Sequence, residues 1–517
     1  MKVPFVRPGL ALLLFAATNS ASASVQTFPT NDPVIRNMWD QGMGSGSQVE
    51  RLAQVLTDSI GPRLIASPGY YAAVDWALKM YDSWGIPARV EQYGTWSAWR
   101  RGHTRLDLIA PHFRTLTGTM LAWSPNTQGP IEGDVVVLPD LPDSDAYERW
   151  LRELQGKFIL ITPPEPTCRP FDNLVSLALP ETVQRIRARR DSVRSAWSSR
   201  YQRAGARLGA RLDGSRAAGI LTSFWSGSWG VNRVMDTDNT RSPSLDISCE
   251  DNGLLHRLAE NQQGPRVRLD ADSEALGEQP VFNVVAELRG RDLPDEYVVL
   301  SAHLDSWDSS SGATDNATGT LMMMEAMRIL KTTYPNPKRT IMAGHWGGEE
   351  QGLNGSKSFA ADHPEVVAGL QVGFNQDNGT WRIEAIRMQG FAEAREPVGR
   401  WLSNIPREVA DTVQFESPSR EGGSDHSSFT CYGVPFLRLQ SNYPDYRRHT
   451  WHTNIDTFDK IIFDDLKNNA TLTAMLAYQA AEDPQRVPRT RAPLPANAQG
   501  QVPDYPGCST PRRSSTG

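Results

Sequence analysis

The sequence predicts an α/β protein with a mixed, mostly parallel central sheet, helices on both faces of that sheet, and a second domain inserted into the chain. From residue 282 onward, short apolar runs alternate with helical patterns, which is the order typical of parallel sheets. Between residues 115 and 280 the pattern changes to short β-rich runs separated by turns, which indicates an insertion. A chain of 517 residues, 39% of them apolar, is long enough for two or three domains.

The amino-terminal segment has the pattern of an export signal. Lys2 and Arg7 precede an apolar run at residues 10–17, and small residues follow up to Ala23, where a signal peptidase would cut. No later stretch reaches the roughly 18 uninterrupted apolar residues of a membrane span. We therefore expect a signal peptide at residues 1–23, no membrane span after it, and a mature protein that is periplasmic or secreted.

The charge balance gives no global attraction to nucleic acid or to an anionic membrane, because a formal net charge of -6 is small for a chain of this length. The four cysteines are scattered and form no CxxC zinc pair. In an oxidising compartment Cys168 and Cys249 are candidates for a disulfide, with free thiols as the alternative.

The larger domain is expected at residues 45–114 and 281–482. Apolar residues recur at helical spacing over residues 49–84, and a turn at residues 60–63 divides them into two helices. The tail at residues 485–517 is rich in Pro, Arg, Ser and Thr and is expected to be disordered. After the insertion we expect strands at 297–302, 339–345, 370–374 and 434–439, and helices at 317–330, 353–361, 392–402 and 466–480.

The insertion at residues 115–280 is expected to contain strands at 134–138, 157–162 and 219–225. Ten arginines lie between residues 185 and 216, with apolar residues between them at helical spacing. A nucleic-acid patch is one interpretation of this run. We favour a long solvated amphipathic helix, because the surrounding chain has no nucleic-acid-binding pattern.

Acidic and imidazole side chains follow the predicted strands at the points where the strands end. Because the carboxyl ends of parallel strands meet at one edge of a sheet, we expect these side chains to lie close together. They are His303, Asp305 and Asp315 after the first strand, Glu349 and Glu350 after the second, Asp377 after the third, and His452 near the end of the domain.

Several carboxylates in one place repel each other by several kcal/mol at pH 7 unless cations neutralise them. A pair of divalent cations bound by imidazole nitrogen and carboxylate oxygen would remove this repulsion, and the mixed ligand set suits zinc, with manganese or cobalt as substitutes. Of the two adjacent glutamates, one is expected to bind metal and the other to transfer protons. Two metals that share a water molecule would hydrolyse an amide bond.

Six motifs together resemble the family of co-catalytic dinuclear zinc exopeptidases, which includes secreted aminopeptidases and glutamate carboxypeptidases. The likeness covers most of residues 45–482. It implies the zinc exopeptidase fold, an inserted β-rich protease-associated domain over the active site, and a homodimer. The motifs are GPRL at 61–64, AHLDSWD at 302–308, GEEQG at 348–352, QDNGT at 376–380, GSD at 423–425 and HTNIDT at 452–457.

The resemblance also implies a role for each side chain at the predicted site. Glu349 would be the general base, which takes a proton from water and passes it to the leaving amine. Asp305 would orient His303, as a metal-bound imidazole requires. The expected ligands are Asp315 as the bridge between two zinc ions, His303 and Asp377 on one ion, and Glu350 and His452 on the other.

Substrate contacts are less well defined by the sequence. Asp425 or His426 could touch the end of a peptide, with a merely structural turn as the alternative. Tyr443 or Tyr446 could donate a hydrogen bond to a tetrahedral oxyanion. An arginine at 447 or 448 could receive a free carboxylate. Candidates therefore exist for an aminopeptidase and for a carboxypeptidase or dipeptidase acting on short peptides, and the sequence leaves this choice open.

Two other functions are compatible with parts of the pattern. A glutaminyl cyclotransferase has a related single-zinc fold with a glutamate pair and a final histidine, but in a shorter chain without the insertion. A non-catalytic ectodomain of the same fold would be expected to lose ligands, whereas this chain has a usable residue at each expected position.

Overall fold

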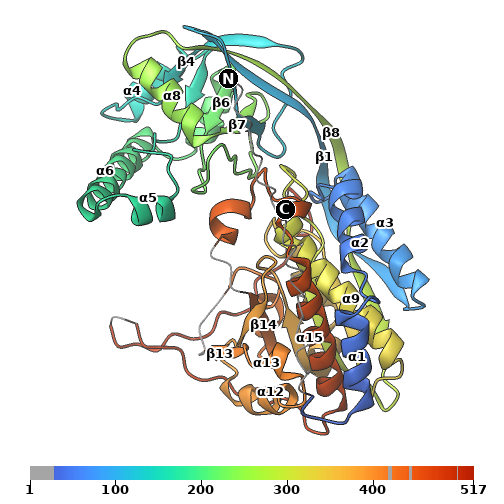
Figure 1. Cartoon of the computed structure of the whole chain (residues 1–517). Helices are drawn as coiled ribbons and strands as arrows, with labels where there is room; N and C mark the ends of the chain where they lie inside the picture. Colours follow the sequence, from blue (N-terminus) through green and yellow to red (C-terminus); the bar gives the residue numbers. More distant parts are fainter. Residues whose placement is uncertain (1–27, 417–421, 442–444, 498, 517) are drawn as a thin grey trace, which may run out of the picture.

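The computed structural model describes residues 28–416, 422–441, 445–497 and 499–516. The predicted signal peptide and Tyr443 lie outside the described residues. Within those residues, none of the helices combines the length and the apolar character that crossing a membrane requires. The described chain forms a large α/β domain and a smaller inserted domain, which are connected by a long two-stranded ribbon (Figure 1).

The sheet of the large domain is mixed and mostly parallel, as predicted. Its four central strands run parallel to one another in the order β14, β11, β9, β10, and antiparallel pairs flank them at β12 and β8. The strands are β8 (Arg266–Leu288), β9 (Leu293–His303), β10 (Arg339–Trp346), β11 (Leu370–Asn375), β12 (Ile383–Arg387), β13 (Gln414–Glu416) and β14 (Phe436–Ser441).

Helices cover both faces of this sheet, again as predicted. Successive side chains of a strand point to opposite faces, so that Val298 and Leu300 of β9 pack into one core and Val299 packs into another. Helices α1 (Pro33–Met43), α9 (Thr318–Thr333) and α15 (Phe463–Glu482) contribute to the first core. Helices α10 (Asn354–Asp362), α11 (Pro364–Gly369) and α14 (Ser427–Thr430) contribute to the second.

The remaining helical elements of the large domain lie close to the predicted ranges. Gly61, with a φ of 80°, ends the first helical stretch at the predicted turn. The elements are α2 (Val49–Ala53), η1 (Gln54–Ile60), α3 (Pro68–Ser83), η2 (Ala313–Ala317), η3 (Ala392–Ala394), α12 (Arg395–Leu402), α13 (Arg407–Ala410), η4 (Tyr446–Thr450) and η5 (Phe458–Lys460).

The ribbon that connects the domains was not predicted from the sequence. Strand β1 (Ala88–Ala110) pairs antiparallel with β8, from the pair Ala88 and Ala286 in the large domain to the pair Ala110 and Arg266 in the insertion (Figure 1). The predicted boundary at residue 280 falls inside β8. The residue pattern of a strand does not change where it leaves one domain for the next, so the pattern could not mark this boundary.

The inserted domain is an α/β unit, which corrects the prediction that it is β-rich. Its strands are β2 (Arg114–Leu116), β3 (Gly118–Met120), β4 (Ile131–Val137), β5 (Phe158–Leu160), β6 (Gly219–Thr222) and β7 (Ser244–Ile247), joined by parts of β1 and β8. Its helices are α4 (Ser144–Leu151), α5 (Phe171–Leu177), α6 (Pro180–Ala204), α7 (Leu208–Gly214) and α8 (Cys249–Glu260).

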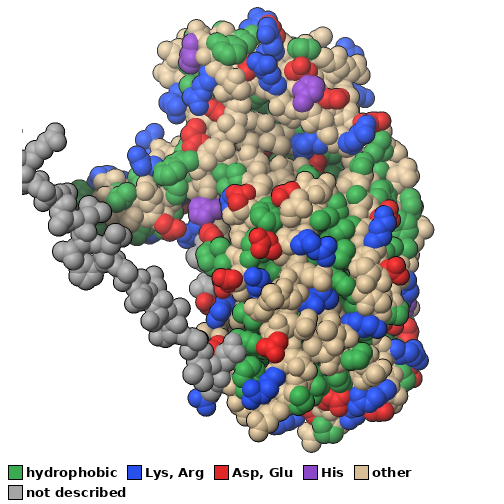
Figure 2. All heavy atoms as spheres, turned by 45° about the vertical axis from the view of Figure 1, so that its right-hand side comes forward, with side chains coloured by type: hydrophobic (Ala, Val, Ile, Leu, Met, Phe, Trp, Pro, Cys, Tyr) green, Lys and Arg blue, Asp and Glu red, His purple; other side chains and the backbone are tan. Residues whose placement is uncertain are grey.

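The arginine-rich run forms helices α6 and α7, as predicted. Most side chains of α6 are exposed, and several of its arginines pair with the rest of the insertion. Arg190 and Arg194 lie 2.6 and 3.0 Å from the carboxylate of Glu165. On the face of the molecule that Figure 2 shows, basic and acidic side chains are mixed, without a continuous basic surface.

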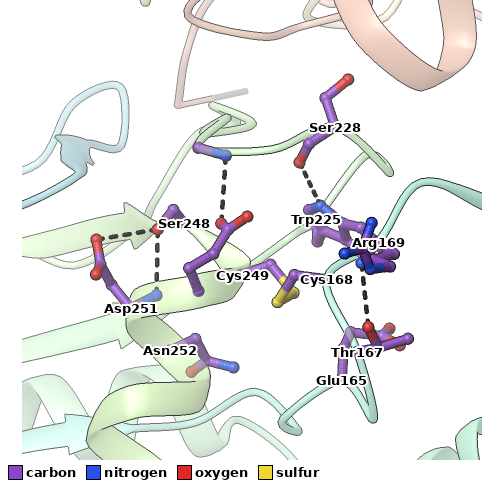
Figure 3. Close-up of a disulfide and its surroundings, with 12 residues drawn as sticks. Glu165, Thr167, Cys168, Arg169, Trp225, Ser228, Ser248, Cys249, Asp251 and Asn252 are labelled. Carbon is purple, nitrogen blue, oxygen red and sulfur yellow. Dashed lines mark hydrogen bonds between the residues drawn. A yellow bond between two sulfur atoms is a disulfide. The ribbon is translucent and has the colours of Figure 1, made fainter.

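Two disulfides hold the described chain. Cys168 and Cys249 are bonded, which realises the pairing considered from the sequence and joins the loop before α5 to the first turn of α8 (Figure 3). Ser248 caps this helix by accepting a hydrogen bond from the Asp251 N–H at 3.2 Å. The second disulfide joins Cys431 to Cys508.

The described residues of the tail contact the large domain, although the composition of this segment is typical of disorder. The Cys431–Cys508 disulfide ties it to the large domain. The guanidinium of Arg513 donates to the carbonyl of Tyr93 at 3.1 Å, and that of Arg491 stacks on the ring of Tyr505 at 4.0 Å. A polar composition predicts disorder because it offers little apolar surface to bury, but here a covalent link and arginine contacts replace that burial.

Candidate metal centre

The predicted side chains converge at one edge of the central sheet. His303 is the last residue of β9, Glu349 and Glu350 follow β10, and Asp377 follows β11. Parallel strands bring their carboxyl ends to the same edge, which explains the convergence. Asp315, in η2 between β9 and α9, and His452, in the loop after η4, complete the group.

The carboxylate of Asp315 lies between two imidazoles. Its Oδ1 is 3.4 Å from Nε2 of His303, and its Oδ2 is 3.3 Å from Nε2 of His452. The same Nε2 of His303 is also 3.4 Å from Oδ1 of Asp377. The same Nε2 of His452 is also 3.0 Å from Oε2 of Glu350. The two halves of the cluster therefore share one carboxylate.

The arrangement of these atoms is better suited to binding divalent cations than to hydrogen bonds between the side chains. At most 8% of each of the five side chains is exposed. Nε2 of His303, Oδ2 of Asp315 and Oε1 of Glu350 are buried and have no hydrogen-bond partner. Buried polar atoms are nearly always paired, so orphaned imidazole and carboxylate atoms that face one point indicate a metal site. Glu349 also lies close enough to His303 and Asp377 for the three side chains to bind one metal ion.

The electrostatics of the cluster lead to the same conclusion. Burial, together with the nearby Asp315 carboxylate, raises the pKa of Glu350 to about 7, although His452 opposes the shift. Burial likewise raises the pKa of Glu349 well above its usual range, and the charges of Asp377 and Asp425 add to the effect. Such carboxylates ionise together only if positive charge is supplied nearby.

Asp305 contacts both His303 and the turn that carries the two glutamates. Nδ1 of His303 lies 3.0 Å from the backbone carbonyl oxygen of Asp305 and 3.6 Å from its carboxylate. The carboxylate instead accepts hydrogen bonds from the backbone N–H groups of Glu349 at 3.2 Å and Glu350 at 3.3 Å. Asp305 thus holds the turn that carries both glutamates, while its carbonyl orients the imidazole.

Two further residues hold the loop that carries Asp315. Asp456 accepts hydrogen bonds from the N–H groups of Thr314 at 2.8 Å and Asp315 at 3.0 Å. Arg63 is fully buried and donates to the carbonyls of Leu304 and Ser311, at 2.8 and 2.6 Å. No role for Arg63 was predicted from the sequence, although it lies in one of the six motifs.

Three of the described candidates for substrate contacts are buried, so a peptide has little access to them. Asp425 and His426 are fully buried, so their contact with a peptide stays a prediction. Tyr446 is 6% exposed and lines a cavity of about 320 Å³ together with Thr314. His345 of β10 shares a 2.6 Å hydrogen bond with the Tyr81 hydroxyl.

Asp308, the last residue of the AHLDSWD motif, pairs with Arg101 at 2.7 Å. This ion pair joins the loop after β9 to the β1 strand of the ribbon. Its carboxylate is therefore engaged away from the metal cluster.

Comparison with known proteins supports the same interpretation. A family model described as Peptidase family M28 matches residues 283–477. Carboxypeptidase Q of Mus musculus is 26% identical over 459 residues, which cover 88% of this chain and 90% of that protein. Within the resembled family, the sequence motifs point to carboxypeptidase Q in particular, and this likeness is confirmed.

Two solved structures are also similar. A peptidase M28 precursor from Shewanella amazonensis has a TM-score of 0.66 and 26% identity, and the match covers 90% of this chain and 98% of that one. BSAP, a zinc aminopeptidase from Bacillus subtilis, has a TM-score of 0.55 over 86% of this chain and 97% of that one; at 16% identity this likeness shows the fold alone. Over residues 283–477 the chain is thus similar to peptidases of family M28, and this likeness agrees with the resemblance that its motifs predicted.

Proposed function

We propose that this protein is a zinc metallo-exopeptidase that hydrolyses dipeptides or short peptides. The observation that carries this proposal is the buried Asp315 carboxylate, whose two oxygens face the Nε2 atoms of two different histidines. A single carboxylate in this position is suited to bridging two cations. Imidazole nitrogen and carboxylate oxygen are ligands that zinc accepts, and manganese or cobalt would be substitutes.

The distances within the cluster support the predicted ligand sets. His303 and Asp377 would hold one cation, Glu350 and His452 would hold the other, and Asp315 would belong to both. When bound, such a pair of cations lowers the pKa of a water molecule and polarises the carbonyl of the scissile bond.

Glu349 is proposed as the general base. Its backbone N–H donates a hydrogen bond to the Asp305 carboxylate at 3.2 Å, and the N–H of Glu350 in the same turn donates to that carboxylate as well. From this position its carboxylate would accept a proton from the attacking water and pass it to the leaving amine. A carboxylate suits both steps, because it can take up a proton and then release it.

The other functions considered from the sequence fit less well. A glutaminyl cyclotransferase would lack the inserted domain, which here extends between the two long strands β1 and β8. A non-catalytic ectodomain would be expected to lose ligands, whereas all five expected ligands and Glu349 lie within one cluster.

The remaining expectations are part of the proposal. We propose that the insertion serves as the protease-associated lid of this family, since the loop at residues 228–235 lies against the loop that carries His452. Export through a signal peptide at residues 1–23, with a periplasmic or secreted mature protein, is supported by the amino-terminal sequence and by the two disulfides. A homodimer is proposed on the family resemblance.

Removal of metal is expected to abolish hydrolysis. After incubation with a chelator and removal of the excess, activity on a dipeptide should fall to background, because the cluster would lose both cations. Zinc or cobalt added back should restore activity in proportion to the metal bound, as measured by elemental analysis beside initial rates. Full activity in a protein shown to contain no metal would exclude the metallopeptidase proposal.

The end of the peptide that is cleaved can be determined with a panel of substrates. Free dipeptides carry both terminal charges, amino-terminally blocked dipeptides carry only the carboxylate, and aminoacyl amides carry only the amine. Cleavage of free dipeptides alone would identify a dipeptidase, since both charges would be required. Cleavage of the blocked dipeptides would identify a carboxypeptidase, and cleavage of the amides an aminopeptidase. Hydrolysis of none of the three classes by the zinc-loaded protein would contradict an exopeptidase.

A further inference from the structure

A segment of the inserted domain, residues 231–235, lies along the loop that carries His452. The backbone N–H of Val234 donates to the carbonyl of His452 at 2.9 Å, and the N–H of Asn454 donates to the carbonyl of Asn232 at 3.1 Å. Arg233 and Thr453 form an antiparallel bridge between these two bonds. The two loops therefore pair like short strands, although they belong to different domains.

The segment is fixed within the insertion as well. The N–H of Arg233 donates to the Asp246 carboxylate at 2.9 Å, and the side-chain amide of Asn232 donates to the Asp246 carbonyl at 3.1 Å. Asp246 belongs to β7 and is buried in the inserted domain. The position of residues 231–235 is thus set by the insertion and transmitted to the His452 loop.

His452 needs such support. Its φ is 58°, in the left-handed region that is unfavourable for a non-glycine residue. Residues in this region persist where the surrounding structure holds them. The hydrogen bond from Val234 engages the carbonyl of His452 itself.

The imidazole of His452 is held from the same side. Its Nε2 faces Asp315 and Glu350, and its Nδ1 lies 3.1 Å from the thioether sulfur of Met235. A neutral imidazole that binds metal through Nε2 carries its proton on Nδ1, and that N–H requires an acceptor. His303 satisfies the same requirement with a backbone carbonyl of its own domain, that of Asp305.

We propose that Met235 is a positioning residue for His452, through which the inserted domain holds the half of the metal centre formed by Glu350 and His452. The proposal rests on the proposed function, because it assigns His452 to a metal. A thioether is a weaker acceptor than a carbonyl. We therefore expect the cation on Glu350 and His452 to be the more weakly bound of the two, and its affinity to depend on residue 235.

Replacing Met235 with leucine tests this directly, because leucine has nearly the same size but accepts no hydrogen bond. The variant should bind the weaker cation about tenfold less tightly, at the lower end of the roughly 10–100-fold range for loss of such a partner. The tighter cation should be unaffected. Affinities are measured by titrating the metal-free full-length protein with zinc against a competing chelator, and the same titration with cobalt gives an absorption spectrum for each site.

Two matched variants separate positioning from packing. Met235→Gln supplies an amide oxygen as acceptor and should restore the affinity of the weaker site to within about threefold of the original. Met120→Leu makes the same exchange at a fully buried methionine of β3 in the inserted domain and should change neither affinity. Activity offers a second readout: Met235→Leu should need about tenfold more zinc for half-maximal rate, with kcat at saturating zinc within twofold of the original.

The possible outcomes are distinguishable. Equal affinities in the original protein and Met235→Leu would overturn the role of Met235, as would a loss that Met235→Gln does not recover. A similar loss at both sites would point to general loosening of the fold and would also overturn it. If the original protein binds no cation, or binds two and hydrolyses no peptide, the proposed function fails instead.

Discussion

Replacing Glu349 with glutamine is expected to lower kcat by about 10²–10⁴-fold, the usual contribution of a positioned general base. Glutamine has the same shape and keeps the backbone N–H that bonds to Asp305, but its side chain cannot accept and release a proton. Because the proposed ligands are untouched, metal content should stay near two per chain. Initial rates on the best dipeptide, measured beside elemental analysis of the same sample, give both quantities.

The metal content decides whether Glu349 is a base or a ligand, because its carboxylate lies close enough to His303 and Asp377 to share a metal ion with them. If Glu349→Gln loses one cation, Glu349 is a ligand and the base lies elsewhere. Retained activity would remove it as the base altogether. Glu384→Gln, which neutralises an exposed glutamate of β12, is the control and should behave like the original protein.

The candidate metal centre at the edge of the sheet could be predicted from the sequence because each of its strand-end residues is marked by a short, local pattern. Each apolar strand ends within a few residues of a polar ligand, and parallel strands bring those ends together. His303 at the end of β9 and Asp377 just beyond β11 are examples. Contacts across loops have no such pattern, so the hydrogen bonds of Arg63 to the carbonyls of residues 304 and 311 became visible only in the structure.

The connection between the domains was hardest to predict. Strands β1 and β8 extend through both domains. Their many polar residues are typical of turns and loops, so the pattern of either segment does not indicate a long strand. The tail at residues 485–517 was predicted to be disordered from its composition, but its link to Cys431 depends on which cysteines meet in space. An isolated methionine such as Met235 gives no signal in a sequence, because its relevance depends entirely on the imidazole that it contacts.

Replacing Asp315 with asparagine is expected to release both cations together. The two carboxylate oxygens of Asp315 face different imidazoles, at 3.4 and 3.3 Å, so loss of the charge weakens both halves of the centre at once. The affinity for each cation should fall by more than the roughly 100-fold that loss of an outer partner can cost. Zinc at 100 times its dissociation constant stabilises the folded state by about 2.7 kcal/mol and therefore raises the Tm of the original protein. This increase in Tm should be absent from the variant.

Asp308→Asn provides the matched control for this result, because Asp308 lies in the same loop region but pairs with Arg101 rather than with an imidazole. It should keep both cations and the increase in Tm with zinc. If Asp315→Asn instead retains one cation at its original affinity, the carboxylate serves only one half of the centre. The two sites would then be independent, and a shared carboxylate could no longer explain why five buried ligands converge on one point.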